Sequence, residues 1–198
     1  MLKQIIKIDV KVQKADLMKL KADCLALGVY SDEKHSDAVD AIDKKLDGAI
    51  SQVRKIGDFK AKTNSSCVIY THGKIAAERI LLVGLGEKKK ADITTFRRAA
   101  AKAGYDAVNL KAKSLAFAVY EDKNIDYEKL GQVMAEGIHF GAYRYDEFLT
   151  NQENGRTDKF SAVLAAGSQA IINKLIQGVK VGQIIGNAQN YSRTLCNR

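Results

Sequence analysis

The stretch RILLVGLGEKKKAD, residues 79–92, decides how the rest of the chain is interpreted. Its apolar run, residues 80–83, predicts a buried strand, and Gly84, Gly86 and three lysines follow it directly. A strand followed by glycines and positive charge is typical of loops that hold phosphate. The first question is therefore whether this is a nucleotide loop or the end of a strand.

The spacing within the stretch favours the end of a strand. A dinucleotide fingerprint needs a third glycine three residues after Gly86, where Lys89 stands instead. The longer phosphate loop needs Gly-Lys-Ser/Thr at the start of a helix, and this motif is absent. A turn at the strand end accounts for the glycines. We therefore predict a strand, a turn and a helix capped by Asp92, running to about Ala103 and stopping at Gly104.

Outward from this stretch, the patterns predict alternating strands and helices. Apolar or alternating runs predict further strands at 4–12, 23–30, 66–71, 114–120 and 160–165. Helical spacing predicts helices at 37–50, from an Asp126 cap to about Tyr143, and from Ser168 almost to the end. Some early strands follow one another without a helix, so part of the sheet is expected to be antiparallel. The pattern predicts an α/β domain with helices on both faces of a mixed sheet.

Glycines recur at four-residue spacing on two of the predicted helices. Gly137 and Gly141 share one helix, and Gly178, Gly182 and Gly186 share the last one. Glycine costs about 1 kcal/mol relative to alanine inside a helix, so a row of glycines needs a reason. The polar residues between them exclude a membrane motif. We predict tight helix packing, either within the chain or against a part of the protein beyond it.

Composition sets further bounds on function. The chain of 198 residues is 46% hydrophobic and 28% charged, as in ordinary globular proteins. It has no apolar run of membrane-spanning length and no signal-type N-terminus, so export is not expected. The net charge of +9 permits nucleic-acid binding, but mixing of basic and acidic residues along the chain favours a solvated surface. Proline is absent although about ten would be expected, which is easier to understand for a piece of a larger protein.

Residue spacing alone indicates no active site. Glu136 and His139 stand three apart on a predicted helix, a pairing seen in some metal sites, but no partner pair accompanies them. No Gly-x-Ser-x-Gly is present. The cysteines are odd in number and lack CxxC spacing, which favours a reducing compartment and argues against a zinc site. The remaining candidates are assigned to turns, surface or core: His35, His72, Cys24, Cys67, Cys196, Glu121 with Asp122, and Asp146 with Glu147.

Three stretches carry a resemblance to a known family. AAERILLVGLGEKKKADITTFRRAAAKA, residues 76–103, resembles the strand-turn-helix of the N-terminal domain of the leucyl aminopeptidases, the cytosol aminopeptidase family. MAEGIHFGAYRYDEFLTNQEN, residues 134–154, is similar to that family's glycine-containing helix and the aromatic-rich segment after it. GQIIGNAQNYSRTLCNR, residues 182–198, resembles the helix that leads into the catalytic domain. Their order and spacing fit the family across roughly residues 20–198.

The resemblance implies a macro-domain-like three-layer α/β/α fold with a mixed central sheet. It implies a macro-like N-terminal domain over residues 1–167 and a linker helix over 168–198 that leads to a C-terminal catalytic domain. In the family, the metal-binding lysine and carboxylates and the catalytic arginine belong to that second domain. No catalytic, cofactor-binding or metal-binding residue is therefore expected in this chain.

The resemblance also implies a cytoplasmic metallo-aminopeptidase as the full-length protein. It would use two divalent metals, manganese or zinc, to remove N-terminal residues from peptides, and would assemble as a hexamer. DNA is a further partner expected for some members, and no membrane is expected. The alternative is a free-standing macro-like module that binds a nucleotide or nucleic acid, supported by the +9 charge and the lysine-rich loop.

Overall fold

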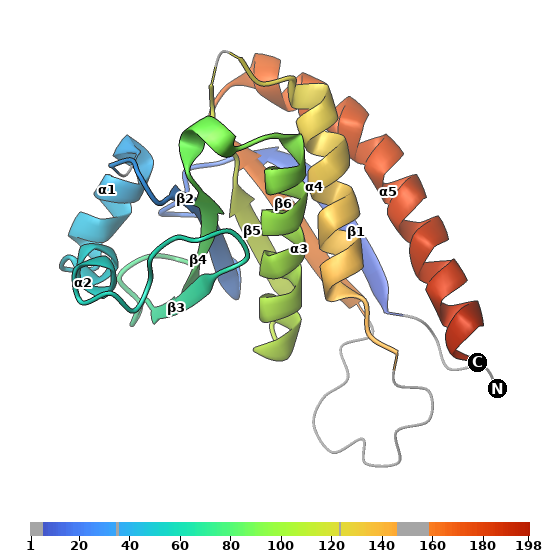
Figure 1. Cartoon of the computed structure of the whole chain (residues 1–198), viewed down its shortest axis with the longest axis horizontal. Helices are drawn as coiled ribbons and strands as arrows, with labels where there is room; N and C mark the ends of the chain where they lie inside the picture. The colour runs from blue at the N-terminus through green and yellow to red at the C-terminus, as the bar shows by residue number, and fades with distance from the viewer. Residues whose placement is uncertain (1–5, 35, 123, 146–158) are drawn as a thin grey trace.

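The structure, a computed structural model, describes residues 6–34, 36–122, 124–145 and 159–198. Within these residues, six strands form one sheet in the order β1-β6-β5-β2-β4-β3 (Figure 1). Only β3 is antiparallel to its neighbour among the described pairings, because it is joined to that neighbour, β4, without an intervening crossover helix. The strands are β1 (Lys7–Lys14), β2 (Cys24–Tyr30), β3 (Ser66–Tyr70), β4 (Arg79–Gly86), β5 (Ser114–Ala118) and β6 (Lys159–Ala166).

Helices cover both faces of the sheet, which makes three layers (Figure 1). On one face, α1 and α2 bury Ile42 and Ile50 against Leu25 and Leu27 of β2. On the other, α3, α4 and α5 form a second and larger core with the alternate strand residues. The predicted mixed three-layer α/β/α fold is confirmed. The helices are α1 (Asp37–Lys45), α2 (Ala49–Lys55), α3 (Ile93–Asn109), α4 (Tyr127–Ala142) and α5 (Gln169–Asn197).

The strand of the opening stretch is longer than predicted. β4 continues through Gly84 to Gly86 and pairs with β2 over this length, with a bulge at Val29 and Tyr30. Gly84 is required by close packing, because a Cβ there would lie 2.1 Å from the main-chain oxygen of Lys62. Gly86 has φ of +74°, a conformation that favours glycine. The glycines therefore belong to the strand and to its exit.

The helix after this strand begins as predicted and ends later. Asp92 caps α3, and its carboxylate accepts the amide of Thr95 at 2.8 Å within a capping box. The prediction that Gly104 stops the helix is wrong, since α3 runs on to Asn109. Gly104 is instead buried against α4, where a Cβ would lie 3.1 Å from the carbonyl oxygen of Ile138.

The single helix predicted over 37–50 is two helices. Asp47 and Gly48 have φ of 55° and 80°, which breaks the helical path between α1 and α2. Asp43, buried at the end of α1, joins the two helices. Its carboxylate accepts the amide of Ile50 at 2.8 Å and the amide of Ser51 at 3.2 Å, so one side chain serves the free amides that start α2.

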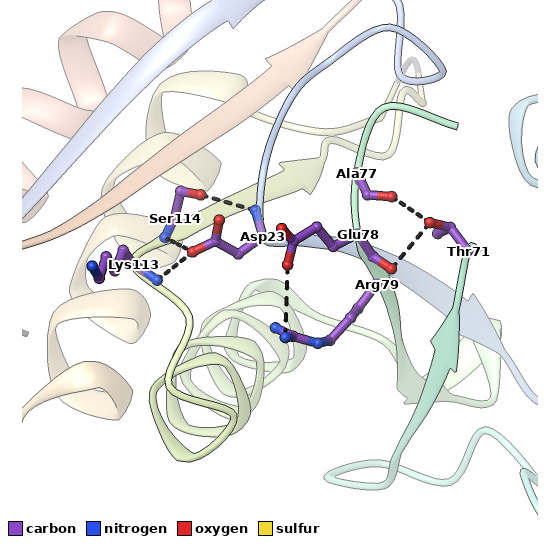
Figure 2. A network of polar contacts seen from close by, with 7 residues as sticks. All are labelled: Asp23, Thr71, Ala77, Glu78, Arg79, Lys113 and Ser114. Carbon is purple, nitrogen blue, oxygen red and sulfur yellow. Dashed lines mark hydrogen bonds and ion pairs between the residues drawn. The ribbon is translucent and has the colours of Figure 1, made fainter. Parts of the chain in front are cut away.

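Polar contacts clamp the amino ends of the parallel strands (Figure 2). The amide of Asp23, before β2, donates to Ser114 Oγ of β5 at 2.9 Å, and its carboxylate accepts the amide of Ser114 at 3.1 Å. Beside β3, the hydroxyl of Thr71 donates to the carbonyl of Ala77 at 2.6 Å. These bonds hold neighbouring strands in register at the edge away from the sheet's carboxyl ends.

The glycine rows bring helix backbones together, as predicted. A Cβ on Gly178 or Gly182 of α5 would lie 1.8 or 2.3 Å from carbonyl oxygens of α4. A Cβ on Gly137 or Gly141 of α4 would lie 2.3 or 1.9 Å from carbonyl oxygens of α3. Both rows therefore pack within the chain. They place α3, α4 and α5 side by side along one face (Figure 1).

Candidate functional site

Open α/β sheets bind ligands at the carboxyl ends of their parallel strands, and in this chain two aromatic side chains occupy part of that edge. The rings of Tyr30 and Tyr120 meet edge to face, with centroids 5.4 Å apart. Burial, with a smaller contribution from Tyr120, raises the pKa of Tyr30 to about 12. The pocket that remains beside them is about 130 Å³, below the usual range for ligand pockets.

Two of the three lysines of the opening stretch, Lys88 and Lys90, are engaged by acids rather than directed at a free anion site. The amide of Lys88 donates to the carboxylate of Asp32 at 2.9 Å, and its ammonium pairs with Glu33 at 2.7 Å. The hydrogen bond to Glu33 is the main reason why the pKa of Lys88 is raised. Lys90 pairs with Glu87 at 2.8 Å. This supports the interpretation of the loop as a strand exit, not a phosphate loop.

A second cavity at the same edge, of about 480 Å³, has mostly apolar walls. Its charged lining residues are two acids, Asp37 and Glu121. The carboxylate of Glu121 accepts the amide of Gly167 at 2.8 Å, just before the start of α5. A helix start is where a phosphate would find free amides, so a carboxylate already in that place disfavours an anionic ligand. Glu121 is exposed, as predicted, and its carboxylate also serves as a structural acceptor.

Glu136 and His139, the metal-like pair on α4, do not act together. Glu136 instead accepts from Arg97 Nε at 3.0 Å and from Gln132 at 2.7 Å. His139 is fully buried between α4 and α5, and neither ring nitrogen has a hydrogen-bond partner within the described part of the chain. Burial lowers the pKa of His139 to about 4, with partial opposition from Asp9. The sequence favoured surface or interface packing for this histidine, and the structure places it in the interface between two helices.

The remaining sequence candidates are scattered. Cys24 is buried, and burial is the main reason why its pKa is raised, while Cys67 is half-buried and Cys196 exposed. Across residues 6–34, 36–122, 124–145 and 159–198, no three His, Cys, Asp or Glu side chains gather in a way that could hold a metal. His35, Asp146 and Glu147 lie outside the described residues. No helix in the described part is long and apolar enough to span a membrane.

An open apolar groove lies over α3, α4 and α5, and we call it the helix groove. It has a volume of about 810 Å³. Its walls include Ala101, Phe140, Ile184, Ile185 and Ala188, with the ion pair of Arg97 and Glu136 at one side. Ile184 is 71% exposed, and further apolar side chains continue along the outer face of α5: Val181, Tyr191 and Leu195. Exposed apolar surface of this extent is typical of an interaction site.

The sequence contained a signal for this surface. Apolar residues at helical spacing run the whole length of α5, but only those up to Val179 are buried in the core. Beyond Val179 the buried positions of α5 are small or polar residues, Gly182, Gly186, Asn190 and Thr194, and the apolar side chains lie on the exposed side of the helix. Apolar residues on the exposed side of a packed helix indicate a partner, but which side is packed could be determined only in the folded chain.

Comparison with known proteins gives a family match. The profile of the "Cytosol aminopeptidase family, N-terminal domain" matches residues 26–152. A probable cytosol aminopeptidase of Alkaliphilus oremlandii is 31% identical over 190 residues, which cover 95% of this chain and 38% of the relative. One from Sulfurihydrogenibium is 26% identical and covers 97% of this chain and 38% of its own length. The chain thus spans little more than a third of these relatives.

Solved structures agree on the fold. A tomato leucine aminopeptidase mutant superposes with a TM-score of 0.73 at 18% identity, over 93% of this chain and 37% of that one. The bottromycin maturation enzyme BotP in complex with Mn gives 0.62 at 23% identity, over 89% and 32%. The macrodomain of Mycobacterium tuberculosis DarG gives 0.59 at 11% identity, over 80% and 98%. At these identities the likeness concerns the fold alone, and it confirms the predicted macro-like architecture.

Proposed function

The chain belongs to the cytosol aminopeptidase family, whose N-terminal domain it matches, and from this premise we propose that it serves as the non-catalytic domain of a cytoplasmic metallo-aminopeptidase. In this proposal, residues 1–167 form the macro-like domain and residues 168–198 form the helix that leads to the catalytic domain. The domain's task is assembly and support. Removal of N-terminal residues from peptides belongs to the other domain, and assembly into a hexamer follows the family expectation.

The observation that carries the proposal is the helix groove with the outer face of α5. Its exposed apolar residues lie on the helix that ends at Asn197. In the curated relatives, most of the sequence lies outside the part matched here. We propose that the occupant of this surface is the catalytic domain, because a segment following Arg198 starts directly beside it. Burying Ile184 and Leu195 there would remove apolar area that the isolated domain leaves in water.

The metals of the proposed enzyme would be held by the catalytic domain. The described residues do not fit a two-metal site, which needs several carboxylate or histidine ligands close together. The manganese named for BotP is consistent with divalent metal in this family, and that enzyme is far longer than the part matched by this chain. No step of peptide hydrolysis is assigned to residues of this chain.

The first test is the reading frame that encodes the chain. We expect the codons after Arg198 to continue into a proline-rich segment carrying a lysine and clustered carboxylates. A stop codon directly after Arg198 would contradict the proposal and favour a free-standing binding module.

The second test is activity. The purified 198-residue chain with manganese should not hydrolyse leucine p-nitroanilide, whereas the chain with its encoded continuation should. Turnover by the 198-residue chain at a rate close to that of the longer protein would contradict a non-catalytic role. A nucleotide-binding module is less well supported, because Tyr30, Tyr120 and the Lys88–Glu33 pair occupy part of the carboxyl edge of the sheet, and the carboxylate of Glu121 already accepts the amide of Gly167 beside the start of α5.

A further inference from the structure

A further pocket lies between α3 and the carboxyl-terminal ends of α4 and α5, beside the helix groove, with which it shares Arg98, Ala101 and Phe140. It has a volume of about 430 Å³, and we call it the arginine pocket. Its lining combines cations and aromatic rings from all three helices and their ends: Arg98, Lys102, Tyr105, Phe140, Tyr143, Arg144 and Arg193. The three helices share a direction because each follows a parallel strand, so their ends come together at one side of the molecule (Figure 1).

The aromatic rings hold the cations in place. The guanidinium of Arg193 lies 4.1 Å from the ring centroid of Tyr143 and 4.7 Å from that of Phe140. The guanidinium of Arg144 lies 4.7 Å from the ring centroid of Tyr105. Stacking of this kind limits the freedom of a long side chain. The positive groups are therefore partly ordered in the free protein.

Part of this charge has a structural task. Arg144 donates to the carbonyl of Tyr143 at 3.0 Å and to Asn109 Oδ1 at 2.6 Å, which ties the ends of α3 and α4 together. Arg193 donates through one nitrogen, Nη1, to the carbonyl of Phe140 at 3.1 Å. Cations are favoured at such helix ends because they face exposed carbonyls. Nη1 and Nη2 of Arg144 also donate to the carbonyls of Gly141 at 3.4 Å and Tyr105 at 3.3 Å, so only its Nε–H is left over. Arg193 donates only through Nη1 in the described structure and keeps its other donors.

The remaining donors are not neutralised in the described structure. Lys102 pairs with Asp106 at 2.6 Å. For Arg98, Arg144 and Arg193, no ion pair with a carboxylate is found among the residues that the structure describes. Arg98 is exposed on α3, where its guanidinium makes no described hydrogen bond. Burial and the neighbouring charge of Arg144 lower the pKa of Arg193, while Tyr143 opposes this. Like charges that face one pocket repel, and a bound anion would relieve that repulsion.

We propose that the arginine pocket binds a small phosphate-bearing anion, held by the guanidinium groups of Arg98 and Arg193, with Arg144 adding positive charge and its Nε–H. A guanidinium presents planar pairs of N–H donors that match phosphate oxygens. This site goes beyond the proposed assembly role, and it lies away from the carboxyl edge of the sheet.

Calorimetric titration of inorganic pyrophosphate into the 198-residue chain tests the site, at constant ionic strength adjusted with sodium chloride. We expect saturable binding, and we expect Arg98→Gln to weaken it roughly tenfold, as for the loss of one charged contact. Arg98 is exposed and makes no described bond, so this variant should fold like the parent, which circular dichroism checks. Lys180→Gln, an equal change of charge on an exposed part of α5, is the matched control and should change affinity less than about twofold.

Three results would overturn the proposal. The first is no saturable binding of pyrophosphate. The second is equal weakening by Arg98→Gln and Lys180→Gln, which would mean attraction to the overall charge of +9 rather than to the pocket. The third is equally tight binding of citrate, a carboxylate anion of similar charge, which would mean that the pocket does not distinguish phosphate. Failure of this site would leave the proposed function untouched, because that function is tested by the reading frame and by peptide hydrolysis.

Discussion

Gly178 of α5 faces the carbonyl oxygen of Glu128 on α4 so closely that a Cβ atom on the glycine would lie 1.8 Å from that oxygen. No side chain can fit there unless the two helices separate. Whether alanine at position 178 raises or lowers stability therefore tests this contact, because alanine inside a helix is otherwise more favourable than glycine by about 1 kcal/mol.

Gly178→Ala should therefore destabilise the chain. We expect the free energy of unfolding to fall by about 3 kcal/mol, since the methyl group meets backbone rather than a movable side chain. Urea unfolding followed by circular dichroism measures the effect. Gly167→Ala is the control, because a Cβ there would meet only the tip of Glu121 at an ordinary 3.5 Å. A gain in stability for Gly178→Ala would show that α5 does not pack against α4 as described.

His139 should make stability depend on pH. Its pKa is lowered from 6.5 to about 4 by burial, so between these values the unfolded chain binds a proton that the folded chain does not. Stability is therefore fully present above pH 6.5 and falls as the pH drops towards 4, by about 3 kcal/mol from this residue. Urea unfolding at pH 7, 5.5 and 4.5 measures this dependence.

The variant His139→Leu distinguishes the contribution of this residue to the pH dependence from that of carboxylates, which titrate in a neighbouring pH range. The variant retains an apolar side chain in the interface but cannot take up the proton. Its loss of stability on acidification should be smaller than that of the parent, with the difference growing as pH falls. Parallel curves for the two proteins would contradict the assignment of a buried, neutral imidazole.

Asp43 should contribute more to the free energy of unfolding than its position on a short helix suggests. Its carboxylate serves the amides of Ile50 and Ser51 at the start of α2, and it is buried. Asp43→Ala should lower the free energy of unfolding by about 2 kcal/mol, because buried amides lose their acceptor. Asp40→Ala, at an exposed position of the same helix, should cost about 0.5 kcal/mol or less. Equal effects in thermal unfolding would argue against the bridging role.

The outer face of α5 should tolerate polar substitution in the isolated chain. Ile184→Ser removes a side chain that is 71% exposed and should change stability by about 0.5 kcal/mol or less. Ile172→Ser on the same helix places a hydroxyl in the core and should cost about 3 kcal/mol or more. Chemical unfolding of both variants makes the comparison. A large loss for Ile184→Ser would mean that this residue supports the domain itself rather than a partner.

The order of strands and helices could be predicted from the sequence because apolar periodicity is a local property. The cap at Asp92 and the start of α4 at Asp126 also depend on neighbours in the chain, and both are found. Gly104 misled the prediction, because a glycine that ends a helix and one that lets another helix approach look alike in sequence. The deciding contact, Ile138, lies on a different helix.

The same limit holds for the two surface features, the exposed apolar residues of α5 and the arginine pocket, which could be predicted from the sequence only in part or not at all. The apolar residues on α5 could be recognised from spacing, but their division into buried and exposed parts depends on which side of α5 packs against α4. The arginine pocket could not be predicted, because Arg98, Arg144 and Arg193 are far apart in the chain and come together only where α3, α4 and α5 pack side by side. Phosphate loops are found in sequence because their donors are consecutive, and here they are not.

Because glycine contacts hold α5 in place, the packing of the domain does not depend on the residues on the exposed face of this helix. Gly178 and Gly182 fix the helix through backbone atoms, so its direction does not depend on the rotamer of any side chain. The opposite face of the same helix, which has 29 residues, is then free to change in evolution while the scaffold stays constant. Divergent relatives can in this way exchange the residues of a docking surface one at a time, without each exchange first having to be compensated inside the core.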